Sequence, residues 1–210
     1  MQCIVTGCAG FIGSNLVDRL LSEGYRVIGI DNFSTGHRKF LDDALTNQRF
    51  RLIEEDLLNL DALISSFKGG ELVFHLAANA DVRFGTDHPG KDLEQNTIAT
   101  YNVLEAMRAN SIKKIVFSST GSVYGEANVI PTPEDAEFPI QTSLYGASKL
   151  AGEGMIAAYC EGFGFQSWIF RFGNIIGKNV KRGVIIELLK KMEKNSSELE
   201  VLGDGSQIKD

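Results

Sequence analysis

Two side chains with acid–base chemistry, Tyr145 and Lys149, lie four residues apart in a segment whose pattern predicts a helix over Leu144–Glu161. A four-residue separation places both side chains on one helical face, within reach of each other. Their unperturbed pKa values are both about 10, and a neighbouring ammonium favours the phenolate form of a tyrosine. We therefore expect Lys149 to lower the pKa of Tyr145 and Tyr145 to act as a general base.

Three consecutive hydroxyl residues, Ser118, Ser119 and Thr120, follow an apolar segment. Hydroxyls at the end of a strand either reach the reacting oxygen of a bound alcohol or satisfy the open end of the strand itself. Both roles stay open for Ser118 and Ser119, whereas contact with a substrate is the favoured interpretation for Thr120.

A glycine-rich turn, Thr6–Gly13, connects an apolar strand to an amphipathic helix. Glycines permit a tight turn and a close approach to a pyrophosphate, whose charge the free amides of the helix start attract. A second apolar strand is followed by Asp31, placed to accept hydrogen bonds from both hydroxyls of an adenosine ribose. The pattern predicts NAD rather than NADP, because the carboxylate would repel a 2′-phosphate. The alternative is a glycine-rich turn without a ligand.

The elements that must position these residues alternate between apolar strands and helices. Strands are expected over Gln2–Thr6, Arg26–Ile30, Phe50–Glu54, Leu72–Ala77, Lys114–Ser119 and Trp168–Phe172. The strongest helical patterns cover Phe11–Glu23, Asp92–Asn110 and Leu144–Glu161, and a helix over Val184–Lys194 and a short strand over Leu199–Leu202 follow. This alternation predicts an α/β fold, a doubly wound parallel Rossmann sheet with helices on both faces and ligands beyond the carboxyl ends of the strands.

Small residues recur at helical spacing in the third of these helices, at Ala147, Ala151, Gly154 and Ala158. They would permit close helix contact, either in a homodimer interface formed by two helices from each subunit or against the sheet. Both interpretations stay open.

The net charge of −6 and the pI near 5.2 give no reason to expect binding to nucleic acid or to an anionic membrane. No apolar run approaches the roughly 20 residues of a membrane span, and the first residues form a strand rather than a signal peptide. We therefore expect a cytoplasmic protein. The three cysteines, Cys3, Cys8 and Cys160, lack metal-ligand spacing, so no metal site is expected.

Short motifs spread from Met1 to Asp210 carry a resemblance to a known family. They are Thr6–Gly13, Asp31–Gly36, Asp56-Leu57, His75–Ala78, Ser118–Gly125, Tyr145–Lys149, Arg171–Asn174 and Gly203–Ser206. Together they resemble the extended short-chain dehydrogenase/reductase family, in particular its nucleotide-sugar 4-epimerases of the UDP-glucose 4-epimerase type.

The resemblance implies NAD as cofactor and a nucleotide-diphosphate sugar, most often a UDP-sugar, as substrate. The implied cofactor contacts are Gly7, Gly10, Phe11, Ile12, Gly13, Asp31, Asn32, Ser34, Thr35, Gly36, Asp56, Leu57, Leu76, Ala77, Ala78, Asn96, Ser118, Tyr145 and Lys149. The implied catalytic residues are Thr120, Tyr145 and Lys149, and the implied substrate contacts are Thr120, Ser122, Tyr145 and Asn174.

The reaction implied is epimerisation at the sugar C4. Tyr145 would remove the 4-hydroxyl proton while NAD takes the C4 hydride, and the 4-keto sugar would turn over before it is reduced on its other face. In the dehydratases of this family, the positions of Thr120, Gly121 and Ser122 are occupied by Thr, Asp and Glu. The decarboxylases of the family also carry a Glu at the position of Ser122. This chain has Gly121 and Ser122 there, which disfavours dehydration and decarboxylation.

We expect residues 1–176 to form the NAD-binding domain with the catalytic residues. Residues 177–210 would begin a substrate-binding domain that stays incomplete, because family members continue well past the Gly203–Ser206 motif. Two alternatives remain, a non-catalytic NAD-binding regulatory module and a nucleotide-sugar dehydrogenase or reductase. Retention of Thr120, Tyr145 and Lys149 argues against the first, and the missing part of the substrate domain argues for it.

Overall fold

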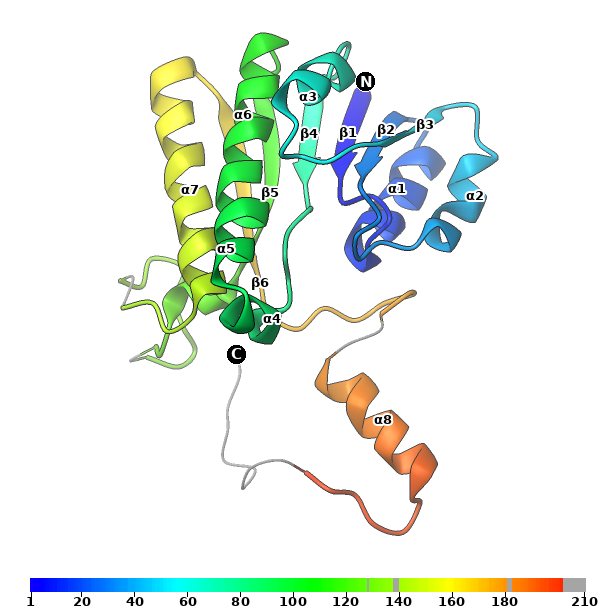
Figure 1. Ribbon diagram of the computed structural model, residues 1–210, viewed down its shortest axis with the longest axis vertical. Helices are drawn as coiled ribbons and strands as arrows, with labels where there is room; N and C mark the ends of the chain where they lie inside the picture. Colours follow the sequence, from blue (N-terminus) through cyan, green and yellow to red (C-terminus); the bar gives the residue numbers. More distant parts are fainter. Residues whose placement is uncertain (128, 138–139, 181–182, 202–210) are drawn as a thin grey trace.

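A computed structural model describes residues 1–127, 129–137, 140–180 and 183–201. Within them, six parallel strands form one sheet in the order β3-β2-β1-β4-β5-β6 (Figure 1). The strands are β1 (Gln2–Thr6), β2 (Arg26–Asp31), β3 (Phe50–Glu54), β4 (Leu72–His75), β5 (Lys114–Thr120) and β6 (Gln166–Phe172). The chain crosses from β3 to the far side of β1, so the strand order reverses between β1 and β4 and leaves a crevice at their carboxyl ends. The predicted doubly wound sheet is confirmed.

Helices cover both faces of this sheet. They are α1 (Phe11–Ser22), α2 (Asp42–Leu45), α3 (Leu60–Ser66), α4 (Val82–Asp87), α5 (Pro89–Asp92), α6 (Ala99–Ala109), α7 (Leu144–Phe163) and α8 (Val184–Lys194), with shorter turns η1 (Arg38–Leu41), η2 (Leu93–Ile98) and η3 (Gly121–Tyr124). None of the helices in the described ranges is long and apolar enough to cross a membrane.

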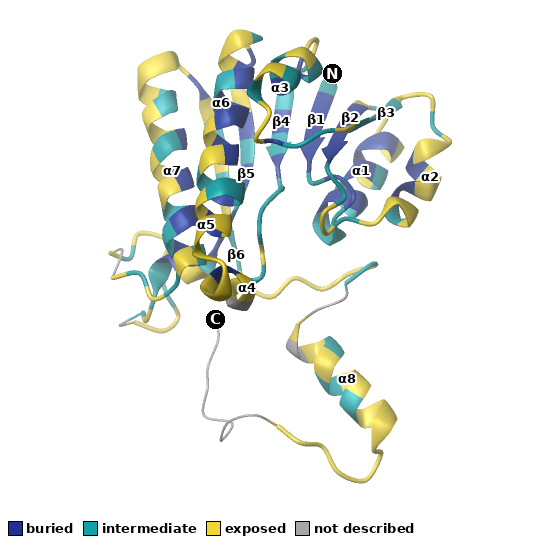
Figure 2. Cartoon of the chain, viewed as in Figure 1, coloured by how far each residue is buried: buried dark blue, intermediate teal, exposed yellow. Residues whose placement is uncertain are grey.

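Alternate residues of β1, β2, β3 and β4 enter two separate hydrophobic cores. In β1, Cys3 and Val5 pack with residues of α1 and α2, whereas Ile4 packs with residues of α3, α6 and α7. The strands between the two layers are largely buried (Figure 2). This two-sided burial explains why the strand segments read as continuous apolar runs.

The expected helix over Asp92–Asn110 is divided. Leu93–Ile98 forms a π-helical turn, η2, between α5 and α6, and Asn96 lies inside it with a side chain that is 2% exposed. A π-helical turn shifts the following side chains around the helix axis, and such turns are frequent at functional sites.

Two further expectations need correction. The strand predicted over Leu199–Leu202 is wrong for residues 199–201, which are not paired with the sheet, and Leu202 lies outside the described residues. The small residues Ala151, Gly154 and Ala158 are exposed on α7, so packing of this face against the sheet is also wrong. The residues of α7 that face the sheet include Gly152 and Ile156.

Helix α8 lies apart from the sheet and its covering helices in Figure 1. Its apolar residues Ile185, Leu189 and Met192 are each about half exposed. Within the expected substrate-binding segment, Val184–Lys194 is therefore helical but contributes little to either core.

Candidate active site

The glycine-rich turn is closely packed against its neighbours. Gly7 has a φ of +69°, and its amide donates to the carbonyl of Ile30 at 2.8 Å. A Cβ on Gly13 would lie 2.0 Å from the oxygen of Gly7, and one on Gly7 would lie 2.8 Å from the backbone of Ala77. Side chains at these positions would displace backbone atoms, so the turn requires glycine.

Helix α1 begins directly after this turn, with Gly10 as its N-cap. It has neither a side-chain cap nor an acidic residue in its first turn. Its first amides and the positive end of its dipole are thus available to an anion. The turn fits the pyrophosphate of a dinucleotide.

Asp31 ends β2 next to this turn, and its side chain is held rigidly. Oδ2 accepts a hydrogen bond from the amide of Ala9 at 2.8 Å, and Oδ1 accepts one from the amide of Phe33 at 2.8 Å. Burial raises the pKa of Asp31, while these two amides lower it. A Cβ on Gly36 would lie 2.7 Å from Oδ1, so this glycine leaves the carboxylate oxygen accessible. An adenosine ribose fits such a fixed acceptor.

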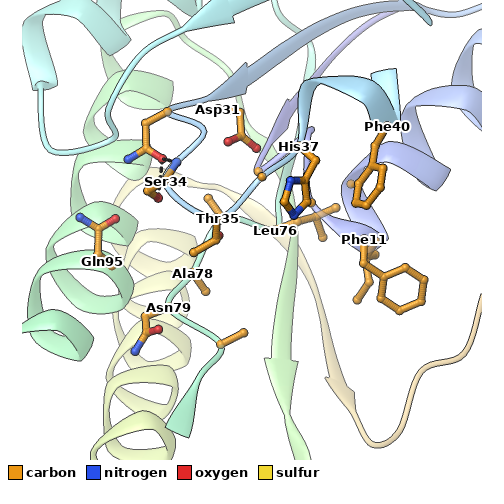
Figure 3. A pocket seen from close by; sticks show the side chains of 18 of the residues that line it. Phe11, Asp31, Ser34, Thr35, His37, Phe40, Leu76, Ala78, Asn79 and Gln95 are labelled. Carbon is orange, nitrogen blue, oxygen red and sulfur yellow. Dashed lines mark hydrogen bonds between the residues drawn. The ribbon is translucent and has the colours of Figure 1, made fainter. Parts of the chain in front are cut away.

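A cavity of about 450 Å³ lies beyond the carboxyl ends of β1, β2 and β4 (Figure 3). Most of the expected cofactor contacts line it, namely Gly7, Gly10, Phe11, Ile12, Gly13, Asp31, Asn32, Ser34, Thr35, Gly36, Leu57, Leu76, Ala77 and Ala78. Lining residues that the sequence analysis missed include His37, Phe40, Glu55, Asn79, Gln95, Asn179 and Val180. The lining includes both the glycine turn and Asp31, the two features expected to bind the pyrophosphate and the adenosine ribose of a dinucleotide.

Asp56 does not line the cavity, although the sequence analysis placed it among the cofactor contacts. Its Oδ2 instead accepts a hydrogen bond from Nδ2 of Asn32 at 3.0 Å. The amide oxygen of Asn32 in turn accepts from the backbone and hydroxyl of Ser34. Asp56 therefore orients Asn32, and Glu55 occupies the lining position.

One wall of the cavity comes from a distant segment. Nδ2 of Asn15 donates to the carbonyl of Lys178 at 2.7 Å, and Nδ2 of Asn179 donates to the hydroxyl of Ser14 at 3.2 Å. These contacts fasten the chain after β6 to α1. Their sequence separations exceed 160 residues, so no local pattern predicts them.

The expected catalytic side chains lie on α7 and at the end of β5, outside the lining of this cavity. Tyr145 lies near the hydroxyl of Thr120, as expected for two groups that share one substrate oxygen, and this hydroxyl lowers the pKa of the tyrosine. Burial is the larger influence and raises that pKa, with a further increase from the charge of Asp92. The expectation that Lys149 lowers the pKa of Tyr145 is therefore wrong for this arrangement, because helical spacing alone contains no information about burial.

Lys149 is buried, with 2% of its surface exposed. Its Nζ donates to the carbonyl of Ser118 at 2.9 Å and lies 4.7 Å from the ring centroid of Phe117. Burial lowers the pKa of Lys149 to about 8, and the carboxylate of Glu153 opposes that decrease. This pKa is closer to neutral pH than the ordinary pKa of a lysine.

Asn96 connects the π-helical turn to α7. Its Nδ2 donates to the hydroxyl of Ser148 at 2.9 Å, and its Oδ1 accepts from the amide of Asn79 at 2.7 Å. Asp92 accepts from both Asn96 and Asn79. Asn96 thus holds the cavity wall at Asn79 against the helix that carries Tyr145, rather than lining the cavity itself.

The remaining expected residues are more peripheral. The amide and the hydroxyl of Ser122 are hydrogen-bonded to the hydroxyl of Thr120, at 3.1 and 3.2 Å. Asn174 is exposed and outside the cavity lining. Gly203–Ser206 lies outside the described residues. The structure thus brings Ser122 and Tyr145 close to Thr120.

Comparison with known proteins agrees with this geometry. Residues 3–210 match the family described as "NAD dependent epimerase/dehydratase family". The UDP-glucose 4-epimerase of Mycolicibacterium smegmatis is 40% identical over 163 residues, which cover 76% of this chain and 51% of that protein.

Two solved structures are similar over nearly the whole chain. The UDP-glucose 4-epimerase of Thermotoga maritima, solved with UDP-glucose, has a TM-score of 0.88 at 34% identity and covers 98% of this chain and 67% of its own. The UDP-glucuronic acid 4-epimerase of Bacillus cereus, solved with UDP-glucuronic acid and NAD, has a TM-score of 0.86 at 34% identity and covers 99% of this chain and 67% of its own.

The chain thus spans between about half and two-thirds of the length of these relatives. The family match covers almost every residue, from the glycine turn through the Tyr145–Lys149 pair. The chain belongs to the NAD-dependent epimerase/dehydratase family, whose cofactor is NAD.

Proposed function

We propose that this chain supplies the NAD-binding and catalytic part of a nucleotide-sugar 4-epimerase that acts on a UDP-sugar of the UDP-glucose and UDP-galactose type. The observation that carries the proposal is the position of Thr120 at the end of β5 and of Tyr145 in the first turn of α7, close to each other and beside a cavity that fits a dinucleotide. The family match and the named epimerases support the same reaction.

Each residue has a defined part in this proposal. Thr120 and Tyr145 bind the sugar 4-hydroxyl, and Tyr145 accepts its proton. Lys149 binds the nicotinamide ribose. Bound NAD supplies the group that accepts and returns hydrogen at the sugar C4. Ser122, in place of an acid, leaves the sugar without a group for elimination.

We propose that residues 177–210 begin a substrate-binding domain; the position of α8 apart from the sheet supports this proposal. Asn174 would contact the diphosphate of the sugar nucleotide once such a domain is in place.

The test is interconversion of UDP-glucose and UDP-galactose by the chain supplied with NAD, followed by chromatography of the products. Conversion by the chain and none by Tyr145→Phe would support the proposal. NAD binding without conversion would favour a non-catalytic regulatory module. Net accumulation of free NADH would favour a dehydrogenase or reductase instead.

We also propose a homodimer formed through the outer face of α6 and α7. Ala151, Gly154 and Ala158 are exposed there, and Tyr101 of α6 is 45% exposed. Small side chains permit close helix contact, which makes this face suited to a second copy. Sedimentation of the chain and of Gly154→Glu tests the homodimer, because a bulky charged side chain at this face would convert a dimer into a monomer.

The free thiols Cys3, Cys8 and Cys160 suit a reducing compartment, and we propose that the protein is located in the cytoplasm.

A further inference from the structure

A carboxylate that the proposed mechanism does not use lies one helical turn beyond Lys149. Glu153 is 6% exposed and projects from the same face of α7. Its Oε1 accepts a short hydrogen bond from the hydroxyl of Ser119 and another from Nε of Arg171 at 3.1 Å. Its Oε2 accepts from Nη2 of Arg171 at 2.8 Å. Both oxygens of this buried carboxylate are therefore hydrogen-bonded, and its orientation is fixed.

Arg171 is itself fixed by the segment that follows β5. Its Nη1 donates to the hydroxyl of Tyr124 at 2.5 Å and to the carbonyl of Glu134 at 3.0 Å. Its guanidinium carbon also lies 4.9 Å from the centroid of the Tyr124 ring. The guanidinium therefore joins α7, β6 and η3, and it holds Glu153 in one place.

The groups around Lys149 show why the position of this carboxylate matters. His75 of β4 has no exposed surface, and burial lowers its pKa to about 3, so it is neutral near Lys149. Burial lowers the pKa of Lys149 itself, and Glu153 is the charge that raises it. Among the titratable and charged groups on the elements around Lys149 and Glu153, His75 is near Lys149, Asp92 acts on Tyr145, and Arg171 pairs with Glu153 and is bonded to Tyr124. The other such groups with described side chains on these elements are Asp87, Lys91, Glu94, Tyr101, Glu105, Arg108 and Lys114.

We propose that Glu153 is a positioning residue of the Tyr145–Lys149 site, and that its carboxylate, held by Arg171 and Ser119, keeps the buried Lys149 ammonium charged. The inference rests on the proposed function only in the role given there to Lys149, which is to bind the nicotinamide ribose. The inference also gives Ser119 a structural role, because its hydroxyl at the end of β5 is bonded to Glu153. The sequence had left open whether this hydroxyl contacts a substrate or satisfies the end of the strand.

The test is a pH titration of the chain labelled with ¹³C at the lysine ε-carbons, followed by NMR. The Lys149 resonance is assigned by its loss in Lys149→Met. In Glu153→Gln we expect the pKa of Lys149 to fall by about one unit, a tenfold change in its protonation equilibrium. Arg171→Gln should shift it in the opposite direction, because the Glu153 charge is then no longer neutralised. Glu105→Gln, which removes a carboxylate from α6, should leave it unchanged.

Opposite shifts separate the proposed electrostatic role from loss of structure. If local unfolding were responsible, both variants would move Lys149 toward its ordinary value of about 10.4. Glu153→Asp retains the charge and should stay closer to the parent chain than Glu153→Gln. An unchanged Lys149 pKa in Glu153→Gln, or equal shifts in the Asp and Gln variants, would overturn the proposal. The titration uses neither NAD nor sugar, so it stands or fails independently of epimerase activity.

Discussion

The ammonium of Lys149 donates a 2.9 Å hydrogen bond to the backbone carbonyl of Ser118. This bond joins α7 to β5 two residues before Thr120, at the edge of the sheet where the strands end. The bond fixes the position of α7 along the strand direction of β5. It therefore also fixes the position of Tyr145, on α7, relative to Thr120, at the end of β5.

The glycine turn gives the first prediction. Gly13→Ala would place a Cβ 2.0 Å from the oxygen of Gly7, which we expect to destabilise the fold by roughly 1–3 kcal/mol and to weaken NAD binding. Gly154→Ala is the matched control, because nothing lies within 4 Å of its Cβ, and it should stabilise by about 0.5–1 kcal/mol. Urea unfolding and calorimetric titration with NAD measure both effects. Equal affinities in the two variants would contradict the assignment of the turn.

Asp31 sets the choice of dinucleotide in this account. Asp31→Asn replaces the charged carboxylate, which would accept hydrogen bonds from both ribose hydroxyls, by a neutral amide with one acceptor oxygen. The affinity for NAD should therefore fall about tenfold or more. NADP should lose less, because repulsion of its 2′-phosphate is relieved. The ratio of the two dissociation constants is the measurement, with Asp61→Asn at an exposed position of α3 as the control. A ratio unchanged from that of the parent chain would exclude Asp31 as the selecting residue.

Acid stability should depend on His75. Its ring is fully buried and hydrogen-bonded to Thr6 at 2.8 Å and Thr100 at 3.0 Å, and burial lowers its pKa to about 3. The unfolded chain then binds more protons than the folded chain between about pH 3 and 6.5, so stability falls as the pH decreases through that window. The loss should approach roughly 1.4 kcal/mol per pH unit from this group.

The check is the free energy of unfolding measured from about pH 7 down to pH 4.5 in the parent chain, in His75→Gln and in His88→Gln. The slope should flatten in His75→Gln, whereas His88 is exposed and its replacement should leave the slope unchanged. An unaltered slope in His75→Gln would show that other groups cause the acid dependence.

Much of the fold could be predicted from local patterns. The segments β1 and β3 match the expected strands residue for residue, and the other strands differ only at their ends, because residues buried on both faces give continuous apolar runs. The strand expected at Leu199 did not form over the described residues, since an apolar run specifies a strand only where a neighbouring strand can pair with it. The π-helical turn around Asn96 has no signature in hydrophobic periodicity.

The site was predictable in its residue types and less so in its electrostatics. The glycine turn and Asp31 follow from chemistry that acts over short sequence distances. The network of Ser119, Glu153 and Arg171 joins residues up to 52 positions apart, and the pKa values of Tyr145 and Lys149 depend on burial that spacing does not contain. The spacing of Tyr145 and Lys149 therefore identified the candidate reacting groups, but it gave the wrong direction for the shift in the pKa of Tyr145.

The most direct test of the central claim is a single-turnover measurement with NAD and UDP-galactose, comparing the parent chain, Tyr145→Phe and Tyr101→Phe. We predict UDP-glucose formation by the parent chain and by Tyr101→Phe, whose ring is exposed on α6, and a loss of at least a hundredfold in Tyr145→Phe with NAD affinity unchanged. Conversion by Tyr145→Phe at the parent rate would contradict the assignment of this phenol as the group that accepts the proton of the sugar 4-hydroxyl.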